Sequence, residues 1–113
     1  MKNSDFNRIA SEQLRKCRDM LIRKGSEYSH NCEDRLVNFK VGGLILGDTP
    51  EKALWGYMTK HLASLKTMID NNDYPNTDII TEKITDSINY LILLKGLIYE
   101  ELVNGQNTNR CIK

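Results

Sequence analysis

The 113-residue chain has few of the residues that mark fibrous, low-complexity or disulfide-stabilised proteins. It contains two prolines and seven glycines, which excludes a collagen-like or low-complexity chain. Its three cysteines are an odd number at wide spacings, and they fit neither a disulfide framework nor a zinc-binding pattern. We therefore expect free thiols in a reducing compartment and no metal site.

Long apolar segments and an excess of one charge are also missing. The longest apolar run, YLILL at 90–94, is far shorter than the roughly 20 residues of a membrane span. The N-terminal MKNSDFNRIASEQ lacks the apolar centre of a signal peptide. With 16 basic and 15 acidic residues, bulk charge excludes a strongly basic protein that binds nucleic-acid duplexes. We expect one soluble, cytoplasmic domain, 1–113, that does not enter membranes.

Helical spacing of apolar residues is what the chain does contain. Gly25, Gly47 and Gly105 are expected to end three helices, and Thr49 is expected to cap another that begins at Pro50. No segment alternates with period two, so we predict an all-α fold, a small antiparallel bundle of about four helices with a polar tail at about 104–113. The expected helices cover 5–24, 33–46, a segment from 50 to the turn sequence DNNDYPNTD, and 78–103.

The fourth predicted helix has two apolar sides. At about 100° per residue, one side is the expected core face, formed by Ile80, Ile84, Ile88, Leu91, Ile98 and Leu102. A second stripe begins with polar residues and continues into apolar ones: Glu82, Asp86, Asn89, Leu93 and Leu97. A solvent-exposed face usually stays polar along its whole length, so we expect this stripe to meet a partner subunit.

The polar groups of that stripe then have two interpretations. At the edge of an interface they are either satisfied by one another or kept for a ligand. In the first case Glu82 and Asp86 pair with basic groups of another helix, and Asn89 bonds a backbone group. In the second case they line a binding site, with Tyr90 on the same edge.

A second group of candidate binding residues lies between the first two predicted helices. Tyr28, Arg35, Asn38, Phe39 and Lys40 combine aromatic, amide and basic side chains in a short window. A nucleobase can stack on an aromatic ring while an amide reads its edge and a cation holds phosphate. The alternative places Phe39 in the core and both Arg35 and Lys40 outside, and for Phe39 alone the core is favoured.

The motifs of common nucleotide enzymes are missing. VGGLILG at 41–47 has no lysine and no preceding strand, so it is not a phosphate-binding loop. All-α nucleotide pyrophosphohydrolases hold Mg²⁺ with Glu-x-x-Glu on one helix and Glu-x-x-Asp on the next. Here Glu82 and Asp86 are four residues apart, and the third helix has no Glu-x-x-Glu pair. We therefore predict a protein that is not an enzyme, with no catalytic residue, metal ligand or cofactor.

Short motifs of the chain resemble a family of small phage proteins. They are KGSEYS, DRLVNFK, TPEKAL, KHLASL and EKITDSINYLILLKG, within roughly 21–101. Through them the chain resembles the Thoeris anti-defence sponges, which are related in pattern to the nucleotide-modification-associated domain. The resemblance implies a viral counter-defence protein that binds a cyclic ADP-ribose isomer made by the host's TIR-domain enzyme and holds it uncleaved. Some members of that family also hold cyclic oligonucleotides.

The resemblance also implies a homo-oligomer, a dimer or a larger assembly such as a hexamer, with pockets at its subunit interfaces. The pocket would use Tyr28, Arg35, Asn38, Phe39, Asn89 and Tyr90, and Arg110 of the tail would close on phosphates from a neighbouring subunit. Two alternatives stay open. One is a phage Mg²⁺-dependent nucleotide pyrophosphohydrolase or nucleotide-modification accessory protein that uses Glu82 and Asp86. The other is a helical adaptor for another protein.

Overall fold

The computed structural model describes residues 1–29 and 33–104, with the main chain alone for 26–29 and 104. These residues form four helices: α1 (Asn3–Ser29), α2 (Val37–Leu46), α3 (Pro50–Asn71) and α4 (Thr77–Asn104). No strand occurs in this part of the chain, which confirms the predicted all-α fold. None of the helices in these ranges is long and apolar enough to cross a membrane.

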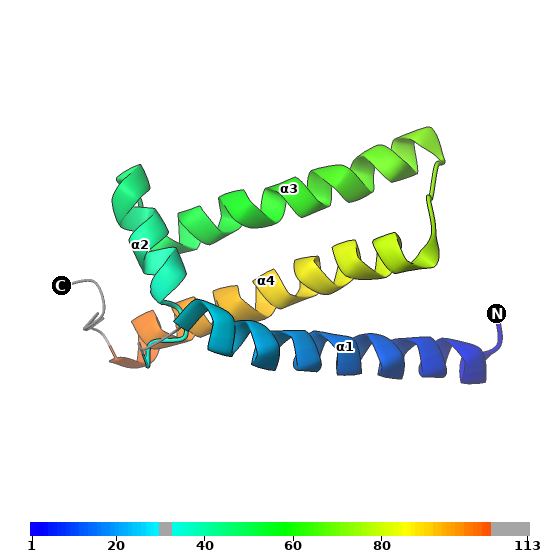
Figure 1. Cartoon of the computed structure of the whole chain (residues 1–113), viewed down its shortest axis with the longest axis horizontal. Helices are drawn as coiled ribbons and strands as arrows, with labels where there is room; N and C mark the ends of the chain where they lie inside the picture. Colours follow the sequence, from blue (N-terminus) through cyan, green and yellow to red (C-terminus); the bar gives the residue numbers. More distant parts are fainter. Residues whose placement is uncertain (30–32, 105–113) are drawn as a thin grey trace.

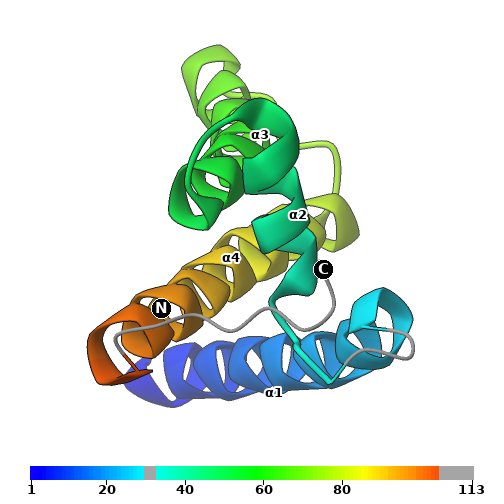
Figure 2. The same cartoon turned by 90° about the vertical axis from the view of Figure 1, so that its left-hand side faces the viewer.

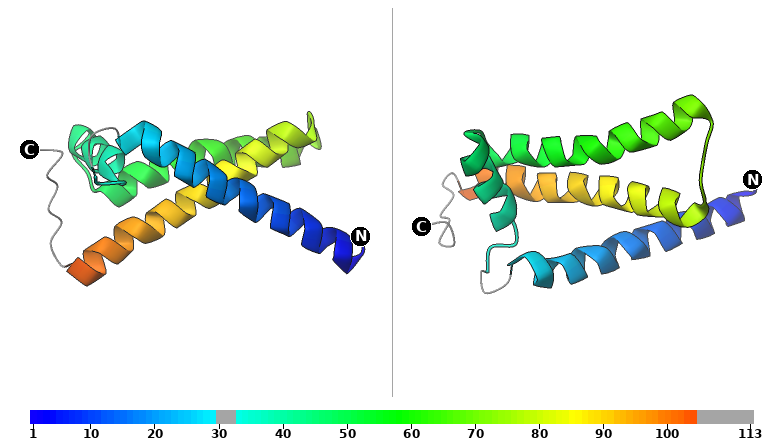
Figure 3. Two further views of the ribbon diagram at one scale, coloured as in Figure 1. Left: turned by 60° about the horizontal axis from the view of Figure 1, so that its bottom comes forward. Right: turned by 45° about the horizontal axis from the view of Figure 1, so that its top comes forward.

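Helix α4 lies between α1 and α3 (Figure 1). Helices α3 and α4 form an antiparallel hairpin, and the short helix α2 lies across the end where α3 begins and α4 ends (Figure 2). Helix α1 runs in the same direction as α4 and crosses it, so the antiparallel expectation is right for α3–α4 and wrong for α1 (Figure 3). Within the described ranges, α1 and α3 each pack on α4 but not on each other.

Local capping explains several helix ends. Gly47 adopts a left-handed φ of 68° and ends α2, as the sequence predicted. The side chain of Thr49 accepts a 3.2 Å hydrogen bond from the backbone N–H three residues on, and Pro50 occupies the first position of α3. Asn76 caps α4 in the same way, with a 2.9 Å bond from the backbone N–H of Ile79 to its side-chain oxygen.

Two helix ends differ from the prediction, one because of a tertiary contact and the other because of a local turn. Helix α1 continues through Gly25 to Ser29 instead of ending at Gly25. A Cβ at Gly25 would lie 3.0 Å from Nε of Arg35, so this glycine makes room for the arginine that packs on α1. Helix α2 begins at Val37 rather than at residue 33, because Asp34 forms a turn in which its Oδ1 accepts a 3.0 Å bond from the backbone N–H of Leu36.

The core lies where α2, α3 and α4 meet. Its buried members are Phe39, Leu54 and Leu97. Partly buried apolar side chains surround them: Leu36, Tyr57, Tyr90, Leu93 and Leu94. Phe39 is therefore a core residue, as favoured from the sequence. Leu36 approaches α4 closely at Gly96, where an added Cβ would stand 3.5 Å from its side chain.

In the C-terminal half of α4 the two apolar sides are used the other way round from the prediction, whereas Ile80, Ile84 and Ile88 of the predicted core face are half-buried. Leu97, placed at a subunit contact by the sequence, is 2% exposed and belongs to the core. Leu102, placed in the core, is 78% exposed, and Leu91 and Ile98 are also exposed. The sequence shows two apolar stripes of similar strength, and the helices that pack around α4 decide which one is covered. An uncovered apolar stripe thus remains on α4.

Candidate functional site

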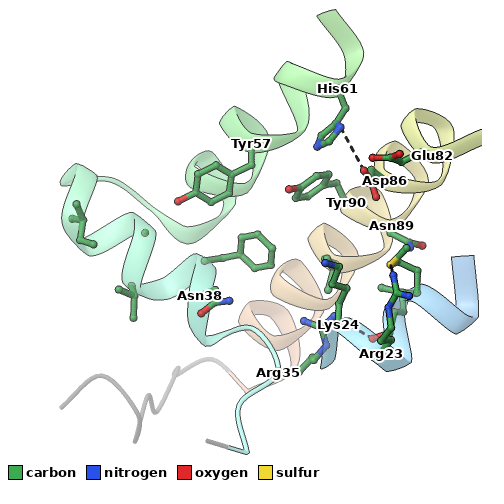
Figure 4. A pocket seen from close by; sticks show the side chains of 17 residues that line it. Arg23, Lys24, Arg35, Asn38, Tyr57, His61, Glu82, Asp86, Asn89 and Tyr90 are labelled. Atoms are coloured by element: carbon green, nitrogen blue, oxygen red, sulfur yellow. Dashed lines mark hydrogen bonds and ion pairs between the residues drawn. The ribbon is translucent and has the colours of Figure 1, made fainter. Parts of the chain in front are cut away.

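A cavity of ≈ 890 Å³ opens among the four helices (Figure 4). Helices α1 and α3 flank α4 without packing on each other, and α2 lies across one end of the space between them. All four helices contribute side chains to the cavity wall. Its volume falls within the range of about 300–1,000 Å³ that is typical of small-molecule sites.

Aromatic rings from three helices form one part of the wall. The ring centroids of Phe39 on α2 and Tyr57 on α3 are 6.1 Å apart. Phe39 meets Tyr90 of α4 edge to face at 6.4 Å, and the His61 ring lies 5.4 Å from that of Tyr90. Such rings provide flat apolar surfaces on which a nucleobase can stack.

Three cations form a basic side of the cavity. Arg23 and Lys24 come from the last turns of α1, and Arg35 comes from the connection to α2 (Figure 4). The guanidinium of Arg35 donates a 3.3 Å hydrogen bond to the backbone oxygen of Leu21, which holds it against α1. Guanidinium and ammonium groups that face one space are suited to phosphate oxygens.

An acidic side lies on α4, next to a histidine of α3. Glu82 and Asp86 occupy successive turns, and Nδ1 of His61 stands 3.7 Å from Oδ2 of Asp86 (Figure 4). This distance is too long for a hydrogen bond, and Nδ1 is buried without a hydrogen-bond partner. In the described part of the chain, no three His, Cys, Asp or Glu side chains are grouped closely enough to hold a metal ion.

Asn89 lies in the wall that joins α4 to α1. Its side chain is buried, and Nδ2 donates a 3.2 Å hydrogen bond to the backbone oxygen of Cys17. The backbone bond that the sequence left as an alternative is therefore present. Its Oδ1 has no hydrogen-bond partner. A buried acceptor without a donor is uncommon in folded proteins, and a ligand that donates to it would satisfy it.

Most of the predicted site residues come together in this cavity. Its lining includes five of the seven that the sequence singled out: Arg35, Asn38, Phe39, Asn89 and Tyr90. The remaining two, the side chain of Tyr28 and the whole of Arg110, lie outside the described residues.

Other lining residues were missed as ligand contacts. Arg23, Lys24 and Tyr57 were not considered, whereas His61, Glu82 and Asp86 were considered but not assigned. One signal could have found two of them: Tyr57 and His61 follow the buried Leu54 at i+3 and i+7, so all three share the inward face of α3. The two cations of α1 have no comparable signal, because their role depends on how α1 crosses α4.

Lys40, for which the sequence left a phosphate contact or a surface position as alternatives, is 2% exposed and is not part of the cavity lining. Its Nζ lies 2.6 Å from Oδ2 of Asp34 and 2.7 Å from Oε1 of Glu100. Burial lowers the pKa of Lys40, but the hydrogen bonds and charges of the two carboxylates outweigh it and raise the pKa above its ordinary value. This ion triad fastens α2 and its preceding turn to α4.

The cavity therefore combines aromatic, basic and acidic walls in one space. A ligand that fits it has a flat ring, an anionic group and hydrogen-bonding edges. No protein-family model, curated protein or solved structure matches the chain.

Proposed function

We propose that this protein binds and sequesters a cyclic nucleotide signal of the cyclic ADP-ribose isomer class without cleaving it, and so blocks Thoeris-type antiphage signalling. The cavity carries the proposal, because it places three aromatic rings and three cations around one space of ≈ 890 Å³. A ligand of this class has a purine for the rings and a diphosphate for the cations. The motifs that resemble the phage sponge family support the same ligand class.

Sequestration needs tight binding, which here would come from two complementary contacts. Phosphates at Arg23, Lys24 and Arg35 would form charge-assisted hydrogen bonds, the stronger kind in proteins. A purine at Phe39 and Tyr90 would lose solvent contact while it stacks. Together they suit slow release, and most differences in affinity arise from the dissociation rate.

We also propose that the protein acts as a homo-oligomer, a dimer or a larger assembly. Large apolar side chains are exposed on α4, and Phe6, Ile9 and Leu14 are exposed on α1. Apolar stripes of this kind on a small domain are typical of protein interfaces. A second copy is the partner that this proposal assigns to them.

A retention experiment tests the binding function. The full chain is incubated with a cyclic ADP-ribose isomer, separated from free ligand by gel filtration, and then heated. We expect intact ligand to be released from the denatured protein, at a constant ratio of ligand to chain. Linear ADP-ribose serves as a comparison, because it carries the same chemical groups without the ring closure. A protein fraction with no ligand, or with degraded ligand, would contradict the proposal.

A Mg²⁺-dependent nucleotide hydrolase is the second candidate function. The observation that favours it is that Glu82 and Asp86 lie on successive turns of α4 and both line the cavity. Carboxylates in this arrangement can hold a magnesium ion that bridges phosphates. Phosphate release from nucleoside triphosphates with and without Mg²⁺ tests it. Activity that disappears in Asp86→Ala would support a hydrolase, and no release from any substrate would reject it.

A further inference from the structure

Hydrogen-bond acceptors dominate one end of the cavity. Glu82, Asp86 and Asn89 follow one another on successive turns of α4 and all line the cavity, and each side chain carries an oxygen acceptor (Figure 4). Two of the three are carboxylates, which accept hydrogen bonds and do not donate them when ionised. We propose that this acceptor end recognises the exocyclic amine of an adenine ring and so fixes one orientation of the ligand. The inference rests on the proposed function and assigns the residues that read the base of its ligand.

Electrostatics separates the two ends of such a ligand. A phosphate beside Glu82 and Asp86 would meet like charge, whereas at Arg23, Lys24 and Arg35 it meets opposite charge. The basic groups lie on the side of α1, and the carboxylates lie on α4 towards His61 (Figure 4). A nucleotide can satisfy both sides in one orientation only, with its diphosphate towards α1 and its base towards the carboxylates.

The unpartnered oxygen of Asn89 is independent support for a donor at this end. Asn89 is 6% exposed, and its Oδ1 is buried without a hydrogen bond. A buried polar atom without a partner costs free energy, so folded proteins keep few of them. An amine carries two N–H donors, and it could serve this oxygen and the carboxylate of Asp86 together.

The rings beside the acceptor end are suited to the rest of the base. Tyr90 lies next to Asn89 in sequence, and its ring contacts that of His61, which in turn faces Asp86. A purine stacked on Tyr90 would turn an edge towards Asp86. Ribose hydroxyls also donate hydrogen bonds, so they are the rival source of donors for the same oxygens.

Exchange of adenine for hypoxanthine tests whether the exocyclic amine, rather than the ribose hydroxyls, donates to the acceptor end. Hypoxanthine replaces the amine with a carbonyl oxygen, which would face the carboxylates as a further acceptor. Its N–H donor on this edge lies on the neighbouring ring nitrogen instead, and the ribose hydroxyls do not change. Titration calorimetry on the full chain would compare a cyclic ADP-ribose isomer with its hypoxanthine counterpart. We expect the adenine form to bind at least about tenfold more tightly, because a site built for an amine rejects an analogue that presents an acceptor at the same position.

Variants at the acceptor end should weaken this preference. Glu82→Gln and Asp86→Asn keep the side-chain size but add an amide donor that can pair with the carbonyl of hypoxanthine. We expect the ratio of the two dissociation constants to fall to roughly threefold or less in each variant. Glu101→Gln is the matched control, an exposed glutamate of α4 outside the cavity lining, and it should keep the full ratio.

The outcomes distinguish this inference from the function on which it rests. Equal affinity for the two ligands would overturn amine recognition, while binding itself would stand. The same preference in Glu82→Gln and Asp86→Asn as in the wild type would also overturn it. No binding of either ligand would overturn the proposed function and this inference together. Glu82 is exposed, so Glu82→Gln should fold even if Asp86→Asn does not, and circular dichroism checks both variants.

Discussion

The side-chain amide of Asn89 on α4 donates a hydrogen bond to the backbone oxygen of Cys17 on α1, at 3.2 Å. A second bond, from Nε2 of Gln13 to Oγ1 of Thr85 at 2.7 Å, lies four residues earlier on both helices. The equal offset on both helices fits two helices that run in the same direction. These bonds place α1, and with it the basic side of the cavity, relative to α4.

We predict that Asn89→Ala lowers both stability and affinity. It removes the bond to Cys17 and with it about 1 kcal/mol of unfolding free energy, the usual net contribution of such a bond. It also removes the unpartnered oxygen at the cavity, so affinity for the cyclic ligand should fall about tenfold or more. Thermal unfolding and titration calorimetry measure the two effects.

Thr85→Val is the control for this prediction. It breaks the neighbouring bond to Gln13 but changes no residue of the cavity lining. Its stability should fall by a similar amount, roughly 1 kcal/mol, while the ligand affinity stays near that of the wild type. If both variants lost affinity equally, Asn89 would act only by holding α1 in place.

The buried ion triad predicts a large effect for Lys40→Met. The variant leaves the carboxylates of Asp34 and Glu100 close together and without their cation. Breaking a buried ion pair on one side costs about 3 kcal/mol. Lys66→Met is the control, because Lys66 and Asp70 form an exposed pair with the same short distance of 2.7 Å. That pair should contribute less than about 1 kcal/mol, so similar losses in the two variants would contradict the role of burial.

The raised pKa of Lys40 predicts how this stabilisation depends on pH. A lysine whose pKa is higher in the folded state than its ordinary value of 10.5 stabilises the fold fully at pH values below 10.5. The contribution is lost as the pH rises through the folded-state pKa. The difference in unfolding free energy between wild type and Lys40→Met should therefore be constant near neutral pH and shrink in strong alkali. A difference that grew with alkaline pH would have the wrong sign.

Features of the fold that depend only on residues close together in the sequence were predictable. Thr49 and Pro50 start a helix through local backbone and capping preferences alone. Gly47 likewise adopts the left-handed conformation that ends a helix without any contact to another element. Gly25 carries the same local signal but lies inside α1, because its missing side chain accommodates Arg35. From sequence alone, a glycine that ends a helix cannot be distinguished from one that makes space for a side chain of another segment.

The site was predictable in part for the same reason. Asn89 and Tyr90 lie on the most specific motif, and Arg35, Asn38 and Phe39 lie in one short window, so local composition indicated them. The two lining cations of α1 could not be found in this way, because only the crossing of α1 and α4 brings them to the cavity. The prediction of the core face of α4 failed in part for a similar reason. Hydrophobic spacing identified both apolar sides of the helix but could not show which one is buried.

Substitution by alanine should have different effects at the two adjacent glycines of α2, on stability at one and on ligand affinity at the other. A Cβ at Gly43 would lie 2.8 Å from the backbone oxygen of Asp48 and 3.0 Å from the backbone nitrogen of Pro50, neither of which can move without shifting the turn. Gly43→Ala should therefore destabilise the fold by about 1–3 kcal/mol despite the better helix propensity of alanine. Thermal unfolding measures this effect, and a stabilised Gly43→Ala would contradict the packing of the turn.

Gly42→Ala should instead act on the cavity. The added Cβ would stand 2.6 Å from the hydroxyl of Tyr57, the far end of a flexible side chain that can turn away. We expect stability within about 1 kcal/mol of the wild type and a weaker affinity for the cyclic ligand, because Tyr57 lines the cavity. Unchanged affinity would show that the position of this ring is not needed for binding.

Arg35 predicts a salt-dependent loss of binding. Arg35→Ala removes one of the three cations of the basic side, so affinity at low salt should fall about tenfold, with a weaker dependence on ionic strength. Arg35→Lys keeps the charge without the planar fork and should lose less. Arg18→Ala is the control on α1, because Arg18 is exposed and outside the lining. An equal loss in Arg18→Ala would indicate general attraction rather than a site.

The exposed stripe of α4 predicts how the oligomer can be disrupted. Leu91, Ile98 and Leu102 recur at helical spacing and are open to solvent in the single chain. If a second copy covers them, Ile98→Glu would bury an unpaired carboxylate in the interface, and sedimentation equilibrium should then show a smaller species than the wild type. Ile69→Glu, an exposed isoleucine near the far end of α3, is the matched control and should keep the wild-type mass. A wild-type protein that sediments as a monomer would contradict the assembly, but it would leave the cavity intact, since every lining residue described comes from one chain.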